Sequence, residues 1–151
     1  MKRFADSLAA VLLVAWVGGM WAIGYIAAPT LFAGLSDRQL AGNLAGELFK
    51  WMAWVGIVAG GYLLLHRLGR HGFSALKQSD FWIVLAMLLL VAGQHFGIQP
   101  VMQALKDQAL PQAVMESAFR SRFAAWHGVS SIVYLIASLL GLILVWRQRG
   151  N

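Results

Sequence analysis

The stretch FWIVLAMLLLVAGQHFGIQPVMQAL, residues 81–105, runs without a single Lys, Arg, Asp or Glu. A helix of about 20 apolar residues is long enough to cross the hydrocarbon core of a bilayer. Three further apolar stretches of this length cover residues 8–33, 48–66 and 123–146. Because lipid offers the backbone no hydrogen-bond partner, each stretch must form a helix. The sequence therefore predicts an all-α integral membrane protein, a four-transmembrane-helix bundle in one domain over residues 1–151.

The composition of the whole chain agrees with a membrane protein. The 151 residues are 60% hydrophobic and 12% charged, whereas soluble domains are about a quarter charged. The absence of cysteine excludes a disulfide scaffold, thiolate catalysis and cysteine-ligated metal sites. Seven Trp and eight Phe exclude an intrinsically disordered chain. Too few charges remain to coat a surface that faces water, so membrane lipids are the expected surroundings.

Basic residues indicate the orientation of the helices, because they gather in cytoplasmic loops. Four spans place both termini on one side of the membrane, together with residues 67–80. That side carries seven Lys and Arg, against five on the other side. We therefore expect both termini in the cytoplasm, with the chain in the cytoplasmic membrane. The net charge of +6 then reflects topology and lipid headgroups. No nucleic-acid partner is expected, since no basic run is interleaved with aromatic residues.

The loops on the opposite side carry helix signals of their own. Ser36 and Gln39 have the spacing of a capping box, so the second helix is expected to begin near Asp37, before it enters the membrane. Pro111 suits a first helical turn, and the following residues up to Phe123 have the pattern of an amphipathic helix. A short interfacial helix is therefore predicted between spans three and four.

Small residues at four-residue spacing indicate where helices pack closely in a membrane. Gly56 and Gly60 form such a pair in the second span, and Gly18 and Ala22 form one in the first. Packing inside one bundle and a homodimer face are both compatible with these pairs. A homo-oligomer, or a partner in a larger membrane complex, therefore stays open.

Polar side chains on two of the predicted helices form the candidate binding site. At about 100° per residue, those of the third span share one helix face, and so do those of the fourth. With a rise of about 1.5 Å per residue, His95 lies at the depth of Tyr134. By the same estimate, Gln99 lies at the depth of Ser130 or Ser131. The candidate residues of the pocket are Tyr25, His95, Gln99, Gln103, His127, Ser130, Ser131 and Tyr134.

These groups predict a polar pocket in the outer half of the bundle. Such a pocket either binds a ligand or serves only to satisfy the polar groups that form it. The depths of His95 and His127 differ by about seven residues, or roughly 10 Å, which disfavours a haem held by both. His127 and Met102 lie at similar estimated depths, so they remain the candidate metal ligands. A His and Met pair suits copper.

Motifs of soluble enzymes are missing from the chain. There is no P-loop, no Rossmann glycine pattern and no metalloprotease His-Glu pair. No carboxylate lies within a predicted span, which disfavours paired-acid chemistry there. Neither an enzyme nor a bound cofactor is expected.

Two motifs carry a resemblance to a known family. The glycine-rich first span ends with P-x-L-F at Pro29–Phe32, and the fourth opens with F-x-x-x-H-G-x-S at Phe123–Ser130. Together with the span count, this pattern resembles the bacterial relatives of eukaryotic transmembrane protein 205, a four-span family of unknown function. The resemblance implies a four-helix membrane protein. It also suggests export or trafficking, because the eukaryotic member is associated with tolerance to platinum drugs. The family pattern has Asn where this chain has Tyr134.

Three hypotheses about function are compatible with these features. The polar pocket and the resemblance favour transport or tolerance of a small molecule or metal ion. The absence of buried charges and the glycine faces instead favour a non-catalytic accessory or scaffold subunit of a membrane complex. The third hypothesis is a redox protein that binds haem or quinone near His95 and His127.

Overall fold

The computed structural model describes residues 2–148, and in that range it contains only helices and the turns between them. Four helical units are long and apolar enough to cross a membrane. In chain order the elements are α1 (Lys2–Ala22), the π-helix η1 (Ile23–Ala27), α2 (Ala28–Gly34), α3 (Arg38–His71), the 3-10 helix η2 (Gly72–Lys77), α4 (Ser79–Ala92), the π-helix η3 (Gly93–Ile98), α5 (Gln99–Ala109), the 3-10 helix η4 (Val114–Glu116) and α6 (Arg120–Gln148). The predicted all-α, four-helix architecture is confirmed.

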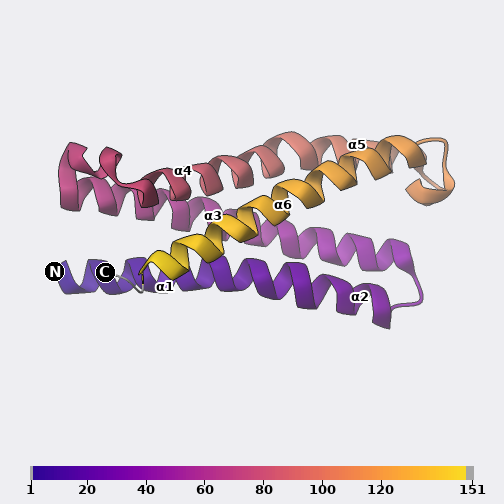
Figure 1. Cartoon of the computed structure of the whole chain (residues 1–151). Coiled ribbons are helices and arrows are strands. Elements are labelled where there is room, and N and C mark those ends of the chain that lie inside the picture. The colour runs from indigo at the N-terminus through magenta and orange to yellow at the C-terminus, as the bar shows by residue number, and fades with distance from the viewer. Residues whose placement is uncertain (1, 149–151) are drawn as a thin grey trace.

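The four units lie side by side as two hairpins, α1–η1–α2 with α3 and α4–η3–α5 with α6 (Figure 1). The start of α1 and the end of α6 lie at the same end of the bundle as η2, which we term the terminal end (Figure 1). The α2–α3 and α5–α6 connections lie at the other end. Close packing joins α1 to α3, α3 to α4 and α4 to α6, and α6 also touches α1.

The second spanning helix begins at the predicted place but with a different capping residue. The Asp37 carboxylate accepts hydrogen bonds from the backbone N–H groups of Gln39 at 2.8 Å and Leu40 at 3.0 Å. The expectation that Ser36 provides the cap is therefore wrong by one residue. A carboxylate directly before the first turn satisfies two N–H groups and also opposes the positive end of the helix dipole.

The short helix predicted between spans three and four is present only as the single 3-10 turn η4. Ser117 follows this turn, and its hydroxyl oxygen accepts a hydrogen bond from the Phe119 N–H at 3.1 Å. This side-chain contact stabilises the start of α6 at Arg120. The last residues of the predicted amphipathic segment therefore belong to the fourth span.

The centre of the bundle is organised around Trp16, whose side chain is 0% exposed. A Cβ on Gly56 would lie 2.6 Å from Trp16 Nε1, and one on Gly60 would lie 3.0 Å from Trp16 Cη2. The two glycines thus form a flat surface on α3 against which the indole packs. The Gly56–Gly60 pair serves packing within one chain, whereas Gly18 has open space around its Cβ position.

Both hairpins have an interruption in their first helix. Each π-helical segment ends two residues before a proline, at Ala27 before Pro29 and at Ile98 before Pro100. Proline lacks an N–H, and its ring clashes with the carbonyl four residues earlier. The wider π-helical turn accommodates the proline without breaking the span. A π-helical turn before a proline therefore occurs at corresponding positions of the two hairpins.

Candidate functional site

A recess of about 40 Å³ lies between α1, α3, η3 and α6. Its polar lining side chains are Trp16, Gln94, His95, Gln99 and Tyr134, and the rest of the lining is apolar. Trp16 belongs to a spanning unit of 32 residues, Arg3–Gly34, and lies near its midpoint. The recess therefore lies near the middle of this spanning unit, whereas the sequence predicted a pocket in the outer half of the bundle.

Three buried polar atoms of this lining have no hydrogen-bond partner among the described residues. They are Trp16 Nε1, Gln94 Oε1 and His95 Nδ1. An indole N–H only donates, an amide oxygen only accepts, and an imidazole nitrogen does either. Buried polar groups are nearly always paired, because each unpaired group costs about 1–3 kcal/mol. Three residues that line the recess therefore each carry a buried polar atom that is unpaired within the described residues.

The volume of the recess limits what this guest can be. A buried water needs about 10–15 Å³ of such space, so the recess has room for about three water molecules or a solute of that size. Pockets for drug-sized ligands and cofactors are far larger, about 300–1,000 Å³. In this conformation the recess does not accommodate a haem or a quinone.

The π-helix η3 holds the polar residues at the recess. Gln94 donates through Nε2 to the Ser130 hydroxyl of α6, which leaves Oε1 for the recess. The His95 ring packs edge-on against Trp54 and Phe96, with ring centroids 5.2 Å and 4.8 Å apart. Neighbouring residues of an α-helix point about 100° apart, yet Gln94 and His95 both line the recess.

Tyr134 closes the recess on the α6 side. Its hydroxyl donates to the Met20 carbonyl at 2.5 Å. Its ring lies so close to η1 that a Cβ on Gly24 would clash with Tyr134 Cε1. The Phe49 ring of α3 packs edge-on against it at 5.1 Å between centroids. Tyr134 thus joins three spans at the level of the π-helical turn.

The structure brings together only part of the residue set predicted from the sequence. His95, Gln99 and Tyr134 line the recess. Ser130 is buried at its rim, where it accepts the hydrogen bond from Gln94. Tyr25 is partly exposed, and its hydroxyl donates to Ser138 at 3.0 Å.

The other predicted residues lie outside the recess. Gln103 is exposed and donates to Asp107 at 2.9 Å. The exposed Ser131 donates to the carbonyl of His127 at 2.9 Å, as hydroxyls on helices commonly do. His127 is itself exposed and stacks on Phe123, with ring centroids 6.1 Å apart.

The metal candidates are not brought together by any described contact. Met102 is buried, His127 is exposed, and neither lines the recess. Within residues 2–148 there is no group of three His, Cys, Asp or Glu side chains that could hold a metal ion. The side chains of this part of the chain therefore do not form a conventional metal site.

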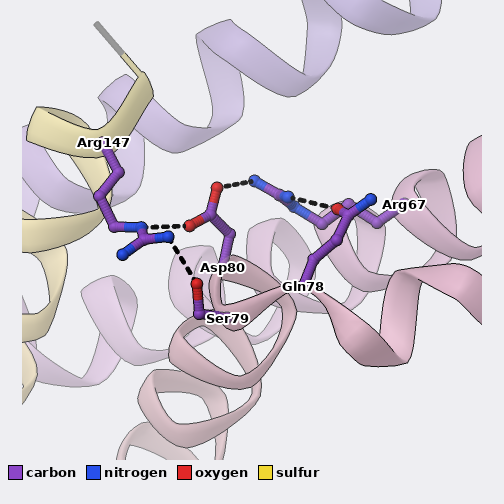
Figure 2. Close-up of polar contacts among 5 residues, drawn as sticks. All are labelled: Arg67, Gln78, Ser79, Asp80 and Arg147. Carbon is purple, nitrogen blue, oxygen red and sulfur yellow. Dashed lines mark hydrogen bonds and ion pairs between the residues drawn. The ribbon is translucent and has the colours of Figure 1, made fainter. Parts of the chain in front are cut away.

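A buried carboxylate at the terminal end was missed by the sequence analysis, which counted it only as a charge. Figure 2 shows Asp80 between two arginines of neighbouring spans. Its Oδ1 lies 2.7 Å from Arg147 Nε of α6, and its Oδ2 lies 3.3 Å from Arg67 Nη2 of α3. Arg147 also donates to Ser79, and Arg67 donates to Gln78 at 3.3 Å. The Asp80 side chain is 11% exposed, so this pairing joins α3, α4 and α6 in a poorly hydrated place.

Trp16 and Gln94 were also missed as site residues. The sequence marks Trp16 only as one more apolar residue of its span. Its proximity to the glycine pair of α3 becomes visible only when the helices are packed. Gln94 is adjacent to the predicted His95 but lies off the helix face that regular α-helical geometry assigns to the pocket.

Fold and recess together define a class, that of four-span helical membrane proteins with a small recess between their spans. The model of one family, a domain of unknown function (DUF4149), matches residues 11–111, and the chain belongs to this family. The match includes the π-helical segments of both hairpins and the recess residues Gln94, His95 and Gln99. No curated protein and no solved structure matches the chain.

Proposed function

We propose that this chain is a multi-pass protein of the bacterial inner membrane that binds a small polar solute in the central recess and passes it across the bilayer. The observation that carries the proposal is that three residues lining one cavity, Trp16, Gln94 and His95, each have a buried polar atom with no partner within the described residues. Polar groups within a membrane are costly and commonly mark the path of a substrate.

The paired helix interruptions support transport over a purely structural role. Secondary transporters commonly bind their substrates near the midplane, between helices that are broken at corresponding positions of two repeated halves. Here η3 supplies Gln94 and His95, while η1 holds Tyr134 through Gly24. We expect α2 and α5, which come directly after the two π-helical turns, to move when the recess opens.

The lining favours an uncharged solute of a few non-hydrogen atoms. No Asp or Glu of the described residues lines the recess, whereas hard metal cations are usually bound by carboxylate oxygens. The resemblance to the relatives of eukaryotic transmembrane protein 205 supports a role in tolerance to a toxic compound. Both arguments make the transport of a metal ion the less favoured of the two transport hypotheses.

Replacing His95 by Leu should abolish most of the flux through the protein. Loss of one hydrogen bond in a desolvated site costs about 1–3 kcal/mol, equivalent to roughly 5- to 150-fold in rate. The full chain would be reconstituted in proteoliposomes. Entry of water, urea and glycerol would be followed by stopped-flow light scattering, and entry of copper and zinc ions by an enclosed fluorescent indicator.

The matched control for His95→Leu is Gln103→Leu, because Gln103 is polar, lies in the same spanning unit and is exposed outside the recess. We expect its flux to stay within about twofold of the unmodified protein, since no hydrogen bond to the guest is removed. Flux equal to that of protein-free vesicles for every solute and ion would contradict transport. Co-purification with a larger complex would then favour the accessory-subunit hypothesis.

The proposed orientation is tested by cysteine labelling, for which the cysteine-free chain provides no background. Ser74 lies in η2 at the terminal end, and Ser36 lies between α2 and α3 at the other end; both are exposed. In intact cells we expect a membrane-impermeant maleimide to label Ser36→Cys and to label Ser74→Cys only after permeabilisation. The reverse pattern would place both termini outside the cytoplasm.

A further inference from the structure

A second recess, of about 220 Å³, lies at the terminal end between α1 and α3. Apolar side chains of both helices form its floor. Its polar walls consist of one acidic residue from α1 and four basic or imidazole residues from α3: Asp6, His66, Arg67, Arg70 and His71. It is separate from the central recess and shares no lining residue with it.

The contacts within these walls leave hydrogen-bond donors to spare. Asp6 Oδ1 lies 3.1 Å from His66 Nε2 and also pairs with Arg70 Nη1. Arg67 reaches Asp80 and Gln78, each at 3.3 Å. A guanidinium group carries five N–H donors, so both arginines have more donors than the partners described here use.

Charge balance in this region favours an anion as the ligand. Arg67, Arg70 and Arg147 face two carboxylates, those of Asp6 and Asp80, in the described part of the chain. The C-terminal end of α3 adds about half a negative charge through its dipole. The cluster therefore keeps a positive excess even when both histidines are neutral.

We propose that this recess binds a phosphate-bearing anion, supplied by the headgroup of an anionic phospholipid. Arginine pairs with phosphate through two parallel N–H···O bonds, and basic pockets between transmembrane helices are suited to acidic headgroups. The apolar floor lies toward the bilayer, and Val11 and Val14 are exposed one to two turns further along α1. A phosphate in the recess therefore has a surface for its acyl chains beside it. This inference is independent of the proposed transport.

The experiment compares lipids with purified full-length protein in detergent. The melting temperature would be followed while short-chain phosphatidylglycerol, phosphatidylcholine or inorganic phosphate is added, because a ligand that binds only the folded state raises it. We expect phosphatidylglycerol to raise the melting temperature and phosphatidylcholine to leave it unchanged. A response to phosphatidylglycerol alone identifies the lipid as the source. An equal response to inorganic phosphate supports the site but assigns it to the free ion.

The variant that tests the site is Arg70→Gln. Arg70 is about half exposed and lies outside the Asp80 pairing, and its exposed pair with Asp6 contributes little to stability, so we expect the variant to fold. Loss of a charge-assisted contact should weaken phosphatidylglycerol binding about tenfold or more. The matched control is Arg120→Gln, which removes the same charge from an exposed position at the other end. An equal response of both variants, or no response of the unmodified protein to either phosphate compound, would overturn the proposal.

Discussion

Replacing Asp80 by Ala is expected to lower the free energy of unfolding by about 3–5 kcal/mol, the cost of removing one partner from a buried ion pair. The loss leaves two arginines from different spans without their shared carboxylate, and Arg67 is only 18% exposed. The pairing joins α3, α4 and α6, so the terminal end of the bundle should loosen first. Unfolding of the purified protein by a denaturing detergent, followed by tryptophan fluorescence, measures this change.

The matched control is Glu47→Ala, which removes a carboxylate from the pair with Lys50. Both partners are more than half exposed, at 61% and 54%. Exposed pairs of this kind contribute about 0–1 kcal/mol, because water screens them and long side chains lose entropy on pairing. Equal effects of Asp80→Ala and Glu47→Ala would show that the Asp80 pairing does not hold the spans together.

The second large effect is expected from Gly56→Ala. The added Cβ would lie 2.6 Å from Trp16 Nε1, so either the indole or α3 must shift. Overpacking of this kind costs about 1–3 kcal/mol. Because Trp16 also lines the central recess, the flux through the protein should fall together with the stability.

Gly61→Ala is the control for Gly56→Ala, since it changes the same residue type on the same helix. A Cβ on Gly61 has open space around it. Alanine is favoured over glycine in a helix interior by about 1 kcal/mol, so this variant should be neutral or more stable. Opposite signs for the two variants are the expected result. Equal stability would show that α3 is not held against Trp16.

Much of the fold follows from composition alone, because hydrocarbon leaves the chain few choices. Each apolar run had to be a helix, and the observed units extend the four predicted spans by only a few turns. The start of α3 was predicted within one residue from polar capping groups. The amphipathic segment after Pro111 was less predictable, because it forms only one 3-10 turn and its last residues, from Arg120, belong to α6.

The candidate site was harder to predict, because it depends on rotation about each helix axis. The prediction placed His95, Gln99 and Gln103 on one face by assuming regular α-helical turns. A π-helical turn contains an extra residue, which rotates the rest of the helix about its axis. Gln94, His95 and Gln99 line the recess, while Gln103 is exposed and bonds to Asp107.

The sequence by itself determined that this chain crosses a membrane as four helices, since the cost of unpaired backbone groups in lipid depends only on local composition. Tertiary structure decided which side chains meet. Trp16 packs on a glycine pair of a different span, and Asp80 joins arginines of two other spans. Such contacts depend on how the helices are rotated and shifted against one another. The rotation and shift of each helix result from the packing of the whole bundle. They therefore cannot be read from the residue pattern of a single span.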